Sequence, residues 1–250
     1  MKISSAHQPA FLPWLGLLHK LMLADKFIFM DIAKFRKRGF MHRNSIEINN
    51  KKSFVGLKVD NQSDFLTCDK VKISANHKLI ILEIRNKLIL NYKNFPFFKD
   101  LKNFIDECLD ENDLLLNSLC FKQLLYFKKK LDLNTEVILE SDLLKDVQLD
   151  GLNATERLLH HAKITNSNIY ITGINSINYL DQEMFKKNNI YNYVQKFDYE
   201  PFLKYQNISE PLSVVHQIAK IGIKNIKNIL AGSQVNKQKL LEEIDKYDRS

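Results

Sequence analysis

The amino-acid sequence predicts an α/β protein, with a mainly parallel sheet flanked by helices, a β-hairpin and a helical insertion. Three patterns carry this prediction. Towards both ends of the chain, short apolar segments typical of strands alternate with segments of helical periodicity. This is the order of elements in βαβ units. Residues 43–59 have the pattern of a hairpin, and residues 76–131 carry apolar residues almost all round, as buried helices do. At 45% hydrophobic residues over 250 positions, the chain has enough apolar side chains for a sizeable core.

The first βαβ unit occupies the N-terminal 31 residues. KISSA (2–6) is interpreted as a short strand, a helical pattern starts at Trp14, and KFIFMD (26–31) has the apolar density of a buried strand. Such a unit normally closes as a right-handed crossover in a parallel sheet. The loop after the first strand, HQPAFLP, should therefore lie at the carboxyl edge of that sheet, beside the start of a helix.

The next segment combines a basic loop with two strands. Residues 32–41 match neither the period of a helix nor that of a strand. They contain several Lys and Arg residues around Phe35 and Phe40, which predicts a basic loop. RNSIEIN (43–49) and SFVGLKV (53–59) are expected to form the hairpin, with a turn at 49–51. Helices should then fill 76–131, with Pro96 separating the first helix from the next.

A second βα unit comes after the helical insertion. TEVILE (135–140) and NIYITG (168–173) are the expected strands, and Asn153 with Glu156 predicts a capping box for the helix between them. A short helix capped by Asp181 and the strand YNYVQKF (191–197) come next, and a helix should begin at Pro211 and end at Gly222. We expect a single α/β domain over 1–232 and a peripheral helix or tail over 233–250.

Charge and composition restrict the class of protein. The net charge of +8 and pI near 9.2 favour anionic partners, although much of the charge comes from Lys on polar helix faces. The three cysteines form no CxxC pair, and Cys108 and Cys120 fall in apolar patterns typical of core thiols. Neither a signal peptide nor a membrane span is expected, which predicts a cytoplasmic protein. Metal and dinucleotide motifs are missing from the sequence, so we expect no metal site and no tightly bound cofactor.

Polar residues that should meet at the carboxyl edge of the sheet form the candidate site. His7 is the candidate general base, and Gln8 or Asn44 could donate a hydrogen bond to an oxyanion. Asp31 ends the second strand and should lie at the same edge. Lys37, Arg38 and Arg43, in and beside the basic loop, have the donors that bind phosphates. For His19 a packing role is preferred, and for the His160–His161 pair a role at the end of a helix.

Several long segments resemble the WbqC-like protein family of bacteria. They run in order from about residue 3 to residue 225: HQPAFLPWLGLLHKLMLADKFIFMD, KFRKRGFMHRNSI, ERLLHHAK, YITGINSINYLDQEMF and PLSVVHQIAKIG. The resemblance implies transfer of an acyl or aminoacyl group onto the amino group of a nucleotide-linked amino sugar, in O-antigen or surface polysaccharide biosynthesis. Matching positions add Trp14, Arg157, Tyr179 and Asp181 as candidate substrate-binding residues. The chain has His216 where the family's late helix is expected to carry an acidic residue.

Alternative functions remain open at this point. A strand followed by a His-containing loop and a helix also opens adenylate-forming and nucleotidyl-transferring enzymes, although their H-x-G-H motif is missing here. A non-catalytic protein that binds RNA or another polyanion would also suit the charge. For the preferred reaction the partners are the nucleotide-linked amino sugar and an acyl donor, which could be acyl-CoA, an acyl carrier protein or an aminoacyl-tRNA. A tRNA is therefore a possible partner, whereas DNA is not expected.

Overall fold

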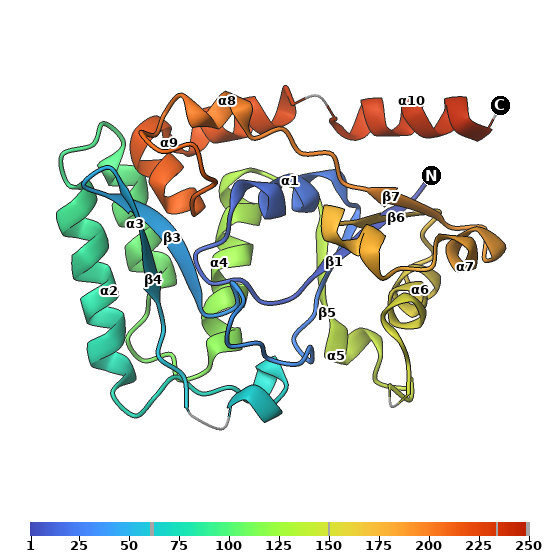
Figure 1. The fold of residues 1–250 in the computed structure, drawn as a ribbon, viewed down its shortest axis with the longest axis horizontal. Helices are drawn as coiled ribbons and strands as arrows, with labels where there is room; N and C mark the ends of the chain where they lie inside the picture. Colours follow the sequence, from blue (N-terminus) through green and yellow to red (C-terminus); the bar gives the residue numbers. More distant parts are fainter. Residues whose placement is uncertain (61–62, 150, 234, 249–250) are drawn as a thin grey trace.

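The centre of the molecule is a five-stranded, all-parallel sheet. The computed structural model describes residues 1–60, 63–149, 151–233 and 235–248. The strands lie in the order β5 (Glu136–Leu139), β2 (Lys26–Phe29), β1 (Ile3–His7), β6 (Ile169–Thr172) and β7 (Tyr191–Val194) (Figure 1). Helices flank this sheet, and a separate antiparallel hairpin lies beside it, so the predicted α/β class is confirmed.

The helices cover both faces of the sheet. Because successive residues of a strand point to opposite faces, the buried side chains of the sheet pack into two separate clusters. Ile3 and Ile169 face α1 (Leu15–Leu23), where they pack with Leu23. Ala6 and Tyr170 face the other side and pack against α6 (Ala154–Ile164) and α7 (Gln182–Lys187). The chain leaves β1 through α1 to β2 on one side, and it leaves β6 through α7 to β7 on the other side. The gap between β1 and β6 is thus the topological switch point of the sheet.

The first βαβ unit is closed by polar contacts at the amino edge of the sheet. The Asp25 carboxylate accepts a hydrogen bond from Ile3 N at 2.8 Å, immediately after α1 ends. The Thr135 hydroxyl, just before β5, donates to the carbonyls of Leu21 and Ala24 at 2.8 and 3.0 Å. The last carbonyls of a helix have no partner within it. The two bonds from Thr135 supply such partners at the end of α1.

The hairpin, α2 (His77–Tyr92) and α3 (Phe98–Cys108) lie at the other end of the molecule, and α4 (Leu116–Lys130) lies between them and the sheet (Figure 1). The hairpin consists of β3 (Arg43–Ile48) and β4 (Lys51–Gly56), and its two turn residues, Asn49 and Asn50, have φ of 50° and 59°. Asparagine tolerates this left-handed backbone, and two such residues in succession make a tight two-residue turn. The hairpin is confirmed, but its second strand begins at residue 51 and not at 53.

The predicted helical segment forms α2 (His77–Tyr92), α3 (Phe98–Cys108) and α4 (Leu116–Lys130). Shorter elements are η1 (Ser63–Phe65), η2 (Cys68–Lys70), α5 (Glu140–Leu143), η3 (Ile174–Asn178) and α8 (Glu200–Leu203). The capping box of α6 is present, with Glu156 N donating to Asn153 Oδ1 at 3.0 Å and Asn153 N donating to Glu156 Oε2 at 2.8 Å. Asp181 caps α7 as predicted.

One predicted helix has different limits. α9 spans Val214–Ala231, with Ser213 as its cap, so the prediction that it begins at Pro211 is wrong. Ser213 N donates to Ser45 O at 2.8 Å and Val214 N donates to Pro13 O at 2.8 Å, which holds this part of the chain extended against β3 and the loop before α1. Gly222, with φ of +77° and ψ of 159°, ends the first helical part of α9 as predicted, and a second helical part follows it to Ala231.

The C-terminal helix α10 (Lys237–Asp248) covers part of the sheet. Leu240 and Ile244 are fully or almost fully buried, and they pack with Ile3 and Ile169. This part of the expected peripheral helix or tail is a helix, and its apolar face meets the buried residues of β1 and β6. Residues 234, 249 and 250 of that predicted segment lie outside the described residues.

Candidate active site

A cleft of about 1150 Å³ opens at the carboxyl edge of the sheet. We call it the carboxyl-edge cleft. It extends from the start of α1 to the segment after β7 and the residues before α9. Its lining residues are Trp14, Gly16, Phe40, Asn44, Lys52, Ile174, Ile177, the continuous run 194–200, Pro211 and Leu212. Ligands of open α/β sheets bind at this edge, beside the switch point.

Aromatic side chains dominate one side of the cleft. The Trp14 and Phe40 ring centroids are 5.8 Å apart at a tilt of 50°. Gly16 allows this packing, because a Cβ at its position would lie 3.1 Å from the indole nitrogen of Trp14 and 3.4 Å from Phe197. No described residue accepts a hydrogen bond from the Trp14 indole N–H. The cleft therefore presents flat apolar surfaces and an available donor together.

His7 lies directly behind this aromatic surface. It is the last residue of β1, and its ring contacts Trp14 edge-on with centroids 5.0 Å apart. Its Nδ1 is 2.6 Å from the Gln8 carbonyl, which can only accept, so Nδ1 carries the proton and Nε2 is left as an acceptor. Burial, and then the nearby Lys20 ammonium, lower the pKa of His7 to about 3. The imidazole is therefore neutral at physiological pH.

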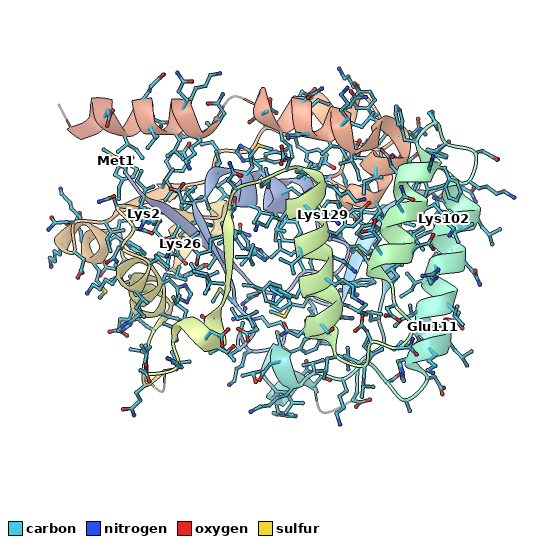
Figure 2. All side chains as sticks on the ribbon, turned by 180° about the vertical axis from the view of Figure 1, so that it is seen from behind. Met1, Lys2, Lys26, Lys102, Glu111 and Lys129 are labelled. Atoms are coloured by element: carbon cyan, nitrogen blue, oxygen red, sulfur yellow. The ribbon has the colours of Figure 1, made fainter. Side chains whose placement is uncertain are left out.

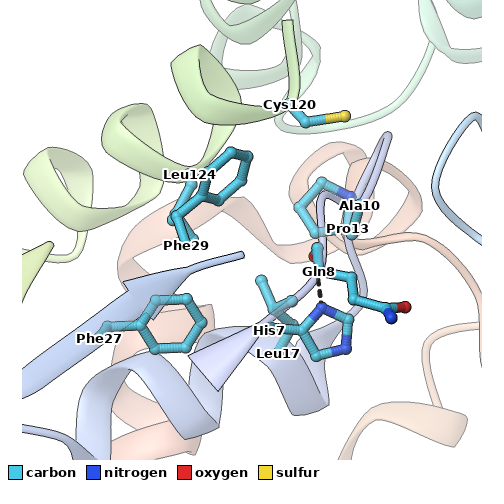
Figure 3. A pocket seen from close by; sticks show the side chains of 9 residues that line it. All are labelled: His7, Gln8, Ala10, Pro13, Leu17, Phe27, Phe29, Cys120 and Leu124. Atoms are coloured by element: carbon cyan, nitrogen blue, oxygen red, sulfur yellow. Dashed lines mark hydrogen bonds between the residues drawn. The ribbon is translucent and has the colours of Figure 1, made fainter. Parts of the chain in front are cut away.

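A second, very small cavity separates His7 from the core. Its volume is about 10 Å³, which is close to the space of one water molecule. Figure 3 shows the lining side chains, which come from β1, β2, the loop before α1, α1 itself and α4. Gln8 lies beside His7 at this cavity, and its side-chain amide has no hydrogen-bond partner among the described residues. Both donors of that amide are thus available.

The loop that carries His7 and Gln8 is held in an unusual conformation at Leu12. This bulky residue has a φ of +47°, which is costly for a side chain with a Cβ. Its N–H donates to Gln123 Oε1 at 2.8 Å, and its carbonyl accepts from Asn44 Nδ2 at 2.6 Å and from Ser213 Oγ at 2.8 Å. Asn44 also accepts from Ser45 N at 2.8 Å. Asn44 therefore borders the cleft but serves mainly to position the loop.

Asp31 follows β2 and is buried next to α5. Its Oδ1 accepts a hydrogen bond from Ser141 N at 2.9 Å, in the first turn of that helix. Asp31 is absent from the lining of the carboxyl-edge cleft. The structure therefore places it at the correct edge of the sheet but on the β2–β5 side, away from Trp14 and Phe40.

Arg157 belongs to a buried polar network centred on Glu140. Its Nε and Nη2 donate to the two oxygens of the fully buried Glu140 carboxylate at 2.6 and 2.5 Å. His161 Nε2 lies 2.8 Å from the same carboxylate, and its Nδ1 lies 2.9 Å from the Tyr170 hydroxyl. The interpretation of His161 as a helix-end charge is wrong, because burial lowers its pKa and its partners are these side chains. The Arg157 guanidinium is committed to this network.

The remaining candidate residues lie around the cleft and not in its lining. Arg43 places its guanidinium carbon 4.9 Å from the centre of the Phe54 ring, on the hairpin. Lys37 and Arg38 are exposed on the basic loop that also carries Phe40. Tyr179 is 60% exposed just after η3, and Asp181 Oδ1 accepts from Met184 N at 3.0 Å as the cap of α7. Of the predicted residues, Trp14 and Asn44 line the cleft, and His7 contacts Trp14.

Sequence reasoning missed the wall formed by residues 194–200. Gln195 follows β7 directly, and its amide nitrogen donates to Gly16 O at 2.8 Å and lies 3.0 Å from His19 Nδ1. His19 is fully buried, as expected of a packing histidine. The position of 194–200 after a parallel strand was the available signal, because such segments lie at the carboxyl edge.

Comparisons with known proteins support the resemblance seen in the sequence. The model of the WbqC-like protein family matches residues 8–228, which is most of the chain. The chain belongs to the WbqC-like protein family. The matched range includes every residue that lines the carboxyl-edge cleft. No curated protein and no solved structure matches this WbqC-like chain.

WbqC-like membership is consistent with a role associated with polysaccharides and compatible with an enzyme. Two further findings concern the described residues. None of the helices in that part of the chain is long and apolar enough to cross a membrane. Within the same residues, no group of three or more His, Cys, Asp or Glu side chains is arranged to hold a metal ion.

Proposed function

We propose that this WbqC-like protein transfers an acyl or aminoacyl group onto the amino group of a nucleotide-linked amino sugar, in the biosynthesis of bacterial O-antigen or another surface polysaccharide. The carboxyl-edge cleft is the observation that carries this proposal. Its volume of about 1150 Å³ suits a ligand of nucleotide-sugar size, and its place at the switch point is where α/β enzymes bind nucleotides.

The lining of the cleft supports a ligand with flat and charged parts. Trp14 and Phe40 offer aromatic faces to a base or a sugar ring. Lys52 and Lys196 are the cations in the lining, and each now pairs with a carboxylate, Glu210 and Glu243 respectively. Ion pairs at the surface contribute little stability, so phosphates can replace these carboxylates at small cost.

The reaction needs an acceptor for the amine proton and donors for the oxyanion. We assign the first role to Nε2 of His7, which is unprotonated at neutral pH, and the second to the amide of Gln8. The amine nitrogen forms a bond to the carbonyl carbon, the bond from that carbon to the carrier breaks, and the amine proton leaves through His7. Because the pKa of His7 is about 3, the ring passes this proton on to the leaving sulfur or oxygen of the carrier, which departs as a thiol or hydroxyl.

The residues around the cleft are assigned to the two substrates. We place Lys37, Arg38 and Arg43 on the side of the acyl donor, because this basic region adjoins Phe40 at the cleft. Acyl-CoA, an acyl carrier protein and an aminoacyl-tRNA are all anionic, in keeping with the net charge of +8. Tyr179 and Asp181 lie next to η3, whose Ile174 and Ile177 line the cleft, and we place them on the side of the sugar.

A two-stage experiment tests the proposal. A thermal-shift screen against UDP-, GDP- and dTDP-linked amino sugars and CoA thioesters first identifies the acceptor. Turnover is then compared for wild type, His7→Asn and a matched control, His160→Asn, on the opposite face of the sheet. Loss of a catalytic acid–base group lowers turnover by about 10²- to 10⁴-fold, so we expect that loss for His7→Asn and less than a twofold change for the control. Full turnover of His7→Asn would refute the assigned role.

A further inference from the structure

Lys20 is a buried ammonium group that the proposed reaction does not use. It lies in the second half of α1, and only 6% of its surface is exposed. Its Nζ donates one hydrogen bond, to the carbonyl of Ala6 at 2.7 Å. Ala6 directly precedes His7, so the ammonium lies next to the end of β1.

The Ala6 carbonyl marks the point where β1 and β6 separate. The β1–β6 ladder ends with the pair Ser5–Ile171, whereas β1 stays paired with β2 as far as His7–Phe29. His7 O accepts from Met30 N on the β2 side. Neighbouring residues of a strand direct their backbone groups to opposite sides, so the Ala6 carbonyl points towards β6. Lys20 Nζ thus occupies the fork at the topological switch point.

The charge of Lys20 is not compensated by the protein. An ammonium group has three donors, and among the described residues Ala6 alone accepts from it, with no carboxylate within ion-pair distance. Buried charges are normally paired, because removal from water without a counter-charge is costly. Burial lowers the pKa of Lys20 to about 8, so the group still carries a charge at neutral pH. An anion would supply the missing partner.

The start of α1 provides a second positive contribution at the same place. Gly16 lies one turn before Lys20 on the same helix face, and it lines the carboxyl-edge cleft. A long side chain in a helix covers the turn that precedes it, which brings the Lys20 stem beneath Gly16. In the first turn of α1, Leu17 N and Leu18 N already donate to Trp14 O at 3.0 and 3.4 Å, so the turn contributes the positive end of the helix dipole and the backbone N–H of Gly16.

We propose that Lys20 Nζ and the first turn of α1 bind a phosphoryl group of the molecule held in the carboxyl-edge cleft, at the fork between β1 and β6. Phosphoryl oxygens suit both the two remaining ammonium donors and the helix N-terminus. This inference concerns binding alone, so it stands or falls independently of acyl transfer.

The proposed site also affects His7. The Lys20 ammonium contributes to the low pKa of His7, because two nearby positive charges repel each other. A bound phosphoryl group would offset that ammonium, and the pKa of His7 should then rise. His7 would become a better proton acceptor only when the anionic ligand is in place.

Calorimetric titration of the 250-residue protein tests the site. The probes are UDP, coenzyme A and inorganic pyrophosphate, all without an acyl donor, so the result does not depend on transfer activity. Lys20→Met keeps the apolar stem and removes the charge. Charge-assisted hydrogen bonds are strong, so we expect pyrophosphate and one of the two nucleotide probes to bind about tenfold more weakly or worse. That nucleotide identifies whether acceptor or donor supplies the phosphoryl group.

Lys26→Met is the matched control. Lys26 begins β2 at the amino edge of the same sheet, near Lys2, and its Nζ is 3.6 Å from Glu136 (Figure 2). It changes the net charge by the same amount as Lys20→Met but lies at the opposite edge. We expect affinity within twofold of wild type. Equal loss in the two variants would mean that only the overall charge matters, and it would overturn the proposal.

A measurement on the wild-type protein covers the case in which Lys20→Met does not fold. Lysine labelled with ¹³C and ¹⁵N reports the pKa of each ammonium by NMR, and Lys20 is recognised as the one that titrates near pH 8. Saturating pyrophosphate should raise this pKa by about one unit or more, because an anion favours the charged form. An unchanged pKa, or unweakened pyrophosphate binding by a folded Lys20→Met, would refute the site.

Discussion

Leu12 shows how single residues shape the candidate site. A left-handed backbone at a leucine costs about 1–3 kcal/mol, and it persists only where the surroundings hold it. Gln123, Asn44 and Ser213 bind its N–H and carbonyl from three distant parts of the chain. Strain of this kind is frequent where a loop must present functional groups. In this protein the strained residue lies in the loop that follows His7, and we propose that His7 and Gln8 are the groups that this loop positions.

Replacing Ser213 should loosen this loop. Ser213→Ala removes the bond to Leu12 O and also the cap of α9, where Ser213 Oγ accepts from Val215 N at 3.3 Å. Loss of a helix cap or of one buried hydrogen bond each costs on the order of 1 kcal/mol. We expect the free energy of unfolding, measured by urea denaturation, to fall by about 1–2 kcal/mol. The exposed Ser118→Ala should change it by less than about 0.5 kcal/mol, and equal effects would contradict this account.

At the scale of elements, the break in α9 has a packing role. Gly222 has a φ of +77°, and a Cβ there would lie 2.5 Å from the Phe97 ring. Phe97 N donates to Ala219 O at 3.1 Å, and Asp100 accepts from Ile223 N at 3.1 Å. The start of α3 therefore fills the interruption and satisfies backbone groups on both sides of it. Gly222 thus ends the first helical part of α9, as expected, and its missing side chain makes room for the start of α3.

Gly222→Ala should therefore be strongly destabilising. The substitution combines left-handed backbone strain with overlap against a ring, and we expect a loss of about 2–4 kcal/mol in the free energy of unfolding. Gly173 is a suitable comparison, because its φ is ordinary and a Cβ there has no atom within 4 Å. Gly173→Ala should stay within about 0.5 kcal/mol of wild type in the same denaturation experiment. A mild effect at Gly222 would show that Phe97 can move aside.

For the molecule as a whole, buried neutral histidines couple stability to pH. Burial lowers the pKa of His7, His19, His161 and His216 below the value of an unfolded histidine. His161 and His216 contact the carboxylates Glu140 and Glu47, and burial still has the larger effect. These histidines bind protons more readily in the unfolded chain than in the folded protein. The free energy of unfolding of the whole fold therefore depends on pH.

The free energy of unfolding should consequently fall in mild acid. Between pH 6.5 and the lowered pKa values, the unfolded chain binds protons that the folded chain does not, so stability declines as the pH falls. The pKa of Glu140 is also lowered, which adds a further loss below about pH 4.5. Each histidine contributes up to about 2 kcal/mol by pH 5. Urea denaturation at pH 7.5, 6.5 and 5.5 measures this decline, and a constant free energy across that range would contradict it.

Local patterns were sufficient for most of the elements. The apolar run at 26–31, the Asn153–Glu156 spacing and the two asparagines of the hairpin turn each report a conformation set within a few residues. Pro211 misled the prediction, because its local preference for a helix start was overridden by the bond from Ser213 N to Ser45 O. For the candidate site, the sequence indicated the carboxyl edge of the sheet and the loop that starts at His7, whereas the contact of His7 with Trp14 came from the structure. It did not indicate the wall at 194–200.

The amino-acid sequence alone determined the α/β class and the order of the elements, and it supported membership of the WbqC-like family. These depend on periodicity and motifs, which are properties of short stretches of chain. Only the tertiary structure decided which side chains meet. Arg157 is bound to Glu140, Leu12 is held by residues 32, 111 and 201 positions away, and Lys20 lies in the fork of β1 and β6 with no counter-ion among the described residues. Such contacts arise because the sheet brings the ends of distant strands to one edge, and no local pattern records that meeting.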